Sequence, residues 1–210
     1  LSSSYLLVQV SRFKFLFGAF LTTLSQPVVA RAKRKHPPGL PVLFFTEMWE
    51  RFSFYCMLSI LALYMNESLG FSTDQVGQVY GWYIGLVYFS PLFGGLLADK
   101  VLGFGRAILF GAIFMGAGHF LLAFPPLPTF FAGLACLIIG NGLFKPNISV
   151  LLGNLYRNLP EKRDDAYNIF YMGINVGAFF SPLVAAYLRN NFGWHYAFGA
   201  AGIGMIISLI

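Results

Sequence analysis

Four ionisable side chains stand inside long apolar stretches of this sequence. Glu47, Glu50 and Arg51 belong to one stretch, and Lys145 belongs to another. Glu47 precedes Glu50 by three residues and Arg51 by four, so a helix would place all three on one face. A charge at the centre of a bilayer costs about 2.5–3.5 kcal/mol even on the mildest scale, and such charges therefore indicate a functional site.

These charges have the composition of a proton-binding cluster. Two carboxylates beside one guanidinium leave an excess negative charge, which Lys145 would balance. Protonation of one glutamate would change that balance and free a cation to bind another group, as in a proton-coupled carrier. The alternative is a neutral cluster that only holds helices together. One or two ions would be enough for that purpose, so we favour the proton-binding interpretation.

Several polar side chains could supply hydrogen bonds in the same apolar surroundings. Tyr55 follows Arg51 by four residues, Tyr88 lies in a second apolar stretch, and Tyr171 and Asn175 are four residues apart. For a single tyrosine, a packed or interfacial ring is the competing interpretation. Asn175 is more informative, because an amide inside a membrane needs partners.

The composition is that of a protein surrounded by membrane lipid. Of 210 residues, 57% are hydrophobic and 10% are charged, whereas soluble domains carry about 25% charged residues. This excludes a soluble enzyme or a nucleic-acid module. Zinc, nucleophile-elbow and phosphate-loop patterns are absent from the sequence, so we expect no metal, no cofactor and no enzyme activity.

Six stretches after Pro41 are long enough to cross a bilayer, which takes about 20 apolar residues. Ser72 or Thr73 is the expected N-cap of the second stretch. We therefore predict an all-α membrane protein with six spans. The predicted spans are Val42–Met65, Val76–Ala98, Arg106–Phe124, Phe130–Leu152, Tyr167–Leu188 and Trp194–Ile210.

The basic residues predict which ends of the spans are cytoplasmic. Nine lie in residues 31–35 or in the loops after the second and fourth spans, and only Arg189 lies on the opposite side. Positive loops stay in the cytoplasm, so we expect a cytoplasmic N-terminus. The nine are Arg31, Lys33, Arg34, Lys35, Lys100, Arg106, Arg157, Lys162 and Arg163.

The two ends of the chain differ from the spans between them. Residues 1–37 form a poorly defined extension, which could be a signal peptide or an upstream region translated from a wrong start. The sixth apolar stretch is still apolar at Ile210, so we expect a fragment of a longer protein. The predicted domains are this cytoplasmic extension and a six-helix transmembrane bundle, residues 38–210.

Three segments and one loop resemble the proton-dependent oligopeptide transporter family of the major facilitator superfamily. Residues 47–55, E-M-W-E-R-F-S-F-Y, resemble the family's first-helix motif E-x-x-E-R-F-x-Y-Y. Residues 170–177, F-Y-M-G-I-N-V-G, resemble its fifth-helix signature, and residues 142–149 its fourth-helix lysine segment. The superfamily's structural loop motif is matched by Gly95, Asp99, Gly103 and Arg106.

The resemblance implies the N-terminal half of a twelve-helix carrier, with two inverted three-helix repeats in its six helices. Such a carrier moves di- and tripeptides with protons across the cell membrane, and it needs a C-terminal six-helix bundle that is absent from this chain. The resemblance implies proton coupling by Glu47 and Glu50. It implies peptide binding by Arg51, Tyr55, Tyr88, Lys145, Tyr171 and Asn175.

Two other functions stay open at this stage. One is another major-facilitator carrier, for nitrate or a drug, although the paired glutamates with an arginine argue against it. The other is a non-transporting membrane fragment, which the apolar end of the chain favours. For one bundle alone, we expect the face with Glu47, Glu50, Arg51 and Lys145 to be exposed to lipid or to a second copy.

Overall fold

A computed structural model describes residues 35–125 and 127–209, and every regular element among them is helical. The predicted extension, residues 1–37, lies outside the described residues except for its last three. The prediction of an all-α protein is confirmed for the part of the chain that the structure describes.

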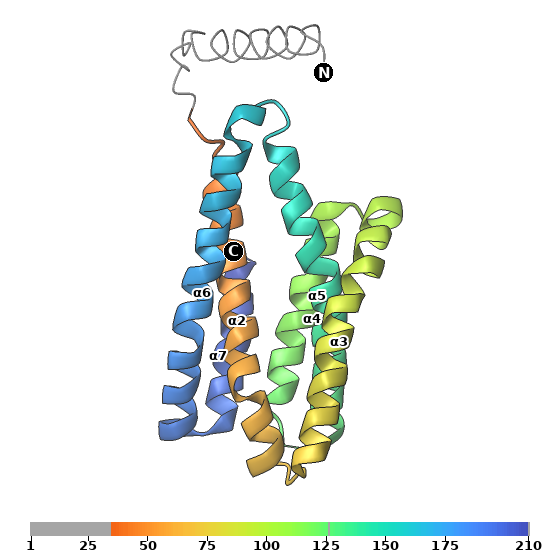
Figure 1. The fold of residues 1–210 in the computed structure, drawn as a ribbon, viewed down its shortest axis with the longest axis vertical. Helices are drawn as coiled ribbons and strands as arrows, with labels where there is room; N and C mark the ends of the chain where they lie inside the picture. Colours follow the sequence, from red (N-terminus) through yellow and green to blue (C-terminus); the bar gives the residue numbers. More distant parts are fainter. Residues whose placement is uncertain (1–34, 126, 210) are drawn as a thin grey trace, which may run out of the picture. The chain divides into compact units, whose positions relative to one another are not determined.

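Six long helices follow one another with short connections (Figure 1). A π-helical turn follows the second of them, and a 3₁₀ turn precedes the fifth. The elements are α2 (Gly39–Glu67), α3 (Thr73–Leu97), η1 (Ala98–Leu102), α4 (Phe104–Leu122), α5 (Leu127–Leu155), η2 (Pro160–Lys162), α6 (Arg163–Phe192) and α7 (Trp194–Ser208).

Each predicted span coincides with one helix to within a few residues at each end. The expected cap of α3 is Ser72, whose hydroxyl accepts a hydrogen bond from the Gln75 amide at 3.3 Å. The Gln75 side chain in turn accepts one from the Ser72 amide at 2.9 Å, which completes a capping box. This reciprocal pair satisfies two amides that the first turn of a helix leaves free.

Four of the six helices are long and apolar enough to cross a membrane by length and composition: α3 with η1, α4, α5, and η2 with α6. Charged Glu47, Glu50 and Arg51 interrupt the apolar run of α2. Helix α7 has 15 residues, fewer than the 20 or so that a span requires. The protein is therefore a membrane protein with several candidate spans.

The helices do not pack in chain order. The first helix, α2, packs against the last two, α6 and α7, while α5 packs against α3 and α4. Figure 1 shows these two groups side by side, and contacts between α4 and α7 join them. Helices that are distant in sequence therefore lie next to each other in the bundle.

Glycines allow the helices in each group to approach closely. A Cβ added to Gly94 of α3 would overlap the carbonyl oxygen of Gly142 in α5. A Cβ on Gly177 of α6 would overlap the carbonyl oxygen of Met48 in α2. Membrane helices associate through van der Waals contact, and small residues are what permit such short backbone separations.

A proline in α3 is compensated by a side chain of α5. Pro91 has no amide proton, so the carbonyl of Val87, four residues earlier, lacks its helical partner. That oxygen instead accepts hydrogen bonds from the Ser90 hydroxyl at 3.2 Å and from the buried Asn141 amide of α5 at 3.0 Å. Pro91 and Asn141 thus fix the register of α3 on α5.

Candidate functional site

The charged residues of α2 are buried inside the six-helix bundle. The exposed fraction is 3% for Glu47, 0% for Glu50 and 3% for Arg51. The expectation that these three would be exposed in a single bundle is therefore wrong. The surrounding helices cover them because α2 packs against both α6 and α7 and also meets α5.

Arg51 is held by both glutamates, and the two contacts differ. Its Nε and Nη2 donate to the two carboxylate oxygens of Glu50, with 2.5 Å between Nη2 and Oε1. Its Nε also lies 3.3 Å from Oε1 of Glu47. The Glu50 pair is bidentate, which is the strongest geometry available to a guanidinium and a carboxylate.

Glu47 is the less satisfied of the two carboxylates. Its Oε2 is buried, and in residues 35–125 and 127–209 it has no hydrogen-bond partner. A buried polar atom without a partner is costly, and a bound proton would remove the charge from this carboxylate. With two carboxylates and one guanidinium, the buried cluster carries one excess negative charge when both glutamates are ionised.

Lys145 approaches the site from α5 without joining the ion pairs. It is half-buried, and its Nζ lies 5.3 Å from the centre of the Tyr88 ring of α3, a cation–π geometry. Among the described residues no carboxylate lies within 4.0 Å of it. Glu47 and Glu50 are still close enough to act on its charge electrostatically. Lys145 is therefore a cation without a fixed anionic partner in this structure.

Three of the other four predicted peptide-binding residues lie on open surface of the bundle. Tyr88 is 71% exposed and Tyr171 is 56% exposed, Asn175 is exposed, and Tyr55 is half-buried. In the described part of the chain, the side chain of Asn175 has no hydrogen-bond partner. The structure thus brings Lys145 to Tyr88, whereas Tyr171 and Asn175 stay on α6 without a described contact to those two.

One residue beside the cluster was not singled out from the sequence. Tyr83 of α3 is 2% exposed, and its hydroxyl has no partner among the residues that the structure describes. It is close enough to Arg51 and Glu50 for their charges to act on it. Its spacing from Val87, a buried residue four positions later, could have indicated an inward-facing tyrosine.

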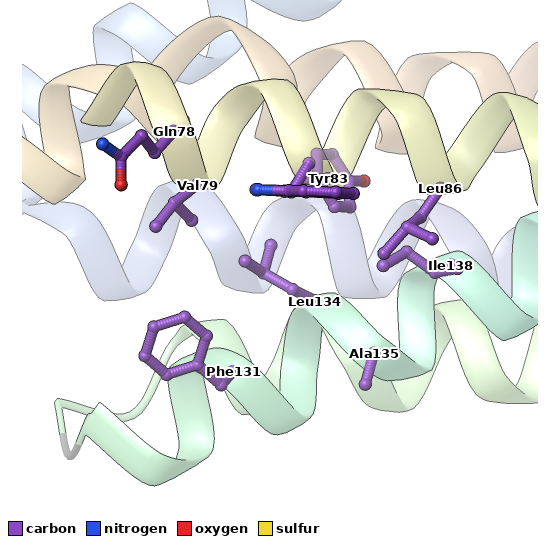
Figure 2. A pocket seen from close by; sticks show the side chains of 9 residues that line it. Gln78, Val79, Tyr83, Leu86, Phe131, Leu134, Ala135 and Ile138 are labelled. Carbon is purple, nitrogen blue, oxygen red and sulfur yellow. The ribbon is translucent and has the colours of Figure 1, made fainter. Parts of the chain in front are cut away.

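A mainly apolar cavity lies outside the charged cluster, although Tyr83 lines it. It measures about 320 Å³ between α3 and α5 and contains no predicted site residue. Figure 2 shows Val79 and Leu86 of α3 on one side of it, and Leu134 and Ile138 of α5 on the other. This cavity has no charged side chain in its lining and is not the candidate site.

The predicted loop motif forms the turn between α3 and α4. Gly103 has a φ of 74°, a conformation that favours glycine, and its amide donates to the carbonyl of Ala98 at 2.8 Å. Gly95 is half-buried, while Asp99 and Arg106 are exposed. Gly103 thereby ends the π-helical turn and starts α4.

Comparison with known proteins finds a family model and relatives that match this sequence. A sequence model described as the POT family matches residues 105–210. The peptide transporter YePEPT of Yersinia enterocolitica is 43% identical over 183 residues, which are 83% of this chain and 36% of that protein. A di-/tripeptide transporter of Lactococcus lactis is 41% identical over 181 residues, or 82% of this chain and 36% of the relative.

Solved structures agree with the sequence comparison. A peptide transporter POT in complex with sulfate matches with a TM-score of 0.80 and 41% identity, over 85% of this chain and 38% of that one. A mutant of the same transporter in complex with alafosfalin matches equally well. The chain thus spans little more than a third of the length of these relatives.

Proposed function

This chain belongs to the POT family, and from that premise we propose that it forms the first six-helix bundle of a proton-coupled symporter of di- and tripeptides. The family is one of transporters and not of enzymes. Because the chain covers 36% of the Lactococcus transporter, a second bundle completes the carrier. We place it in the cell membrane with a cytoplasmic N-terminus, because the basic loops lie on one side.

The six helices are two inverted three-helix repeats, α2–α4 and α5–α7. Two observations support this. The two triplets pack in the same way, because the first helix of each triplet packs on the second and third helices of the other. The sequence Phe-Ser-Pro-Leu also occurs twice, at residues 89–92 in α3 and 180–183 in α6, which are the second helices of the two triplets.

Local geometry at the two Phe-Ser-Pro-Leu copies supports the same repeat. The Ser181 hydroxyl donates to the carbonyl of Ala178 at 3.0 Å, as Ser90 does to Val87. In each copy a serine thus bonds a carbonyl three residues earlier, just ahead of a proline, and this is a usual way to satisfy the backbone of a membrane helix.

The observation that carries the proposed proton coupling is the difference between Glu47 and Glu50. Both carboxylate oxygens of Glu50 accept hydrogen bonds from Arg51. Glu47 has one contact of 3.3 Å and a buried oxygen without a described partner. Proton entry therefore occurs at Glu47, where it removes the excess charge of the cluster, and Glu50 keeps Arg51 in place.

Lys145 and Arg51 bind the carboxylate of the peptide, and Lys145 is the more accessible of the two. Tyr55, Tyr88, Tyr171 and Asn175 line the peptide pocket opposite the second bundle. The exposure of Tyr88, Tyr171 and Asn175 supports this assignment, since α3 and α6 present these three polar groups on surface that the six helices leave open.

Uptake of labelled dialanine into liposomes tests the coupling role in the full-length transporter that contains this chain. Glu47→Gln, which keeps the shape but cannot gain and lose a proton, should abolish uptake driven by a pH gradient and leave peptide counterflow. Glu67→Gln is the matched control, because Glu67 is a partly exposed glutamate outside the cluster that pairs with Arg189. Gradient-driven uptake by Glu47→Gln at the wild-type rate would exclude this role.

The same liposomes test the substrate class. Unlabelled dipeptides should compete with dialanine, and nitrate should not. Competition by nitrate without competition by dipeptides would favour the other major-facilitator carriers over a peptide symporter.

A further inference from the structure

A cavity of about 440 Å³ opens at the end of the bundle where α5 ends and α6 begins. It is distinct from the charged cluster, and none of the residues assigned to proton coupling or peptide binding lines it. Two of its lining residues are arginines, Arg157 and Arg163. The connection between α5 and α6 is one of the basic loops that indicate the cytoplasmic side.

The two arginines have no anionic partner in the described residues. Neither guanidinium lies within 4.0 Å of a carboxylate in residues 35–125 and 127–209. The acidic residues of the same connection, Glu161, Asp164 and Asp165, do not line the cavity. The cavity therefore presents positive charge even though the connection as a whole is balanced.

The floor of the cavity is shaped by a glycine. A Cβ on Gly153 would lie 3.1 Å from the Tyr167 hydroxyl and 3.3 Å from Nη2 of Arg163. The Arg163 guanidinium also lies 5.8 Å from the centre of the Tyr167 ring, and that hydroxyl donates to the Ser149 carbonyl at 3.0 Å. Gly153 thus leaves the space into which Arg163 and Tyr167 fit.

The rest of the lining suits a ligand that is partly apolar. Val150 and Pro160 contribute apolar side chains to the lining, and the buried Tyr156 lies beside them. The Tyr156 hydroxyl is fixed by His36, whose Nδ1 lies 2.7 Å from it. Tyrosines are enriched at the level of the lipid headgroups, and Tyr156 and Tyr167 both stand at this end of the spans.

We propose that this cavity binds the phosphate headgroup of an anionic phospholipid of the surrounding leaflet. A guanidinium presents a planar fork that matches two phosphate oxygens. Basic pockets between membrane helices on the cytoplasmic side bind anionic headgroups in this way. The phosphate lies between Arg157 and Arg163, and the glycerol and first methylenes lie along Val150 and Pro160. The site rests on the proposed orientation but not on the proposed substrate.

Titration of the purified 210-residue chain in detergent with phosphatidylglycerol, followed by native mass spectrometry, measures this site. Phosphatidylcholine is the reference lipid. We expect phosphatidylglycerol to bind at least tenfold more tightly. The double variant Arg157→Gln/Arg163→Gln should lose that preference, and Lys100→Gln, which removes an exposed positive charge elsewhere on the same side, should keep it.

Two further arms separate this proposal from its rivals. Gly153→Leu fills the cavity without a change of charge and should weaken phosphatidylglycerol binding as the double variant does. Soluble glycerol 3-phosphate should not compete at equal concentration, because it lacks the acyl chains. An unchanged preference in both variants, with the helical circular dichroism intact, would overturn the site. Equal competition by glycerol 3-phosphate would assign it to a free phosphate.

Discussion

At the scale of single residues, the cations of the site differ in how far they are already occupied. Arg51 is buried and shared by two glutamates, so most of its hydrogen-bonding capacity is used within α2. Lys145 is half-buried and faces the π-surface of Tyr88 instead of a carboxylate. A cation held by an aromatic ring can exchange that contact for an anion, whereas separating a buried ion pair costs several kcal/mol.

This difference predicts that Lys145 distinguishes a peptide with a free carboxylate from one without. In the full-length transporter, Lys145→Gln should weaken binding of dialanine by about tenfold, equivalent to 1.4 kcal/mol. Binding of dialanine amide should change little, because the amide carries no negative charge at that end. Competition against a labelled dipeptide measures both affinities, with Lys100→Gln as the control. An equal loss of affinity for both ligands would show that Lys145 does not bind the peptide carboxylate.

Residue types and spacing were enough to predict the α2 cluster, because ionisable residues are rare inside apolar segments and three of them share one helical face. The ion pairing of Lys145 could not be predicted in the same way. The balance of positive and negative charges in the sequence suggested Lys145 as the counter-ion of Glu47 and Glu50. In this structure, however, Lys145 contacts the Tyr88 ring. Net charge limits the number of ions in a site and leaves their pairing open.

At the scale of helices, the position of α3 on α5 depends on a few small or polar residues. Gly94 meets the backbone of Gly142, and Asn141 supplies the hydrogen bond that Pro91 removes from Val87. The helices are apolar on most sides, so hydrophobicity gives little preference for one face over another. Close backbone contact and buried hydrogen bonds provide that preference instead.

Two glycine variants of α3 test this account. Gly94→Ala places a methyl group against the Gly142 carbonyl, and the resulting overpacking should cost about 1–3 kcal/mol. Gly85→Ala lies on the same helix with nothing within 4 Å. Alanine favours a helix by about 1 kcal/mol over glycine, so Gly85→Ala should leave the stability unchanged or raise it. Thermal unfolding in detergent gives the midpoints, and similar values for both variants would contradict the packing argument.

The boundaries of the helices could be predicted from the sequence, but the way the helices pack on one another could not. Length, apolar runs and a Ser72 cap are local signals, so each helix could be placed within a few residues of its observed ends. The packing of α2 against α6 and α7 is a long-range property. The shared face of Glu47, Glu50 and Arg51 indicates an inward side of α2, but it does not indicate which helices cover that side.

At the scale of the whole molecule, the six helices differ in how much of their apolar surface the bundle covers. In their apolar 18-residue stretches, α4 and α5 have 44% and 50% of the residues buried. The corresponding stretches of the segments that contain α3 and α6 have only 22% and 28% of the residues buried. The open helices α3 and α6 are also those that carry Tyr88, Tyr171 and Asn175. Their uncovered faces therefore fit a boundary with a second bundle better than one with lipid alone, since an amide in lipid lacks partners.

We therefore predict that the 210-residue chain alone does not transport peptides. Carriers of this kind bind substrate near the midplane between two bundles, and they alternate access by rocking one bundle against the other. A single bundle lacks the partner for that motion and supplies only one wall of the pocket. The buried cluster of Glu47, Glu50 and Arg51 is covered without a second bundle, so the chain should still fold and keep its helices.

Reconstitution of the purified chain in liposomes, with an inward proton gradient and labelled dialanine, tests folding and transport separately. Circular dichroism should report a helical protein, and dialanine should not accumulate above the level of empty liposomes. Addition of the proposed second bundle as a separate chain should restore gradient-dependent uptake if the open faces of α3 and α6 are the interface. Saturable accumulation by the 210-residue chain alone would mean that two copies, packed face to face, can build a working cavity.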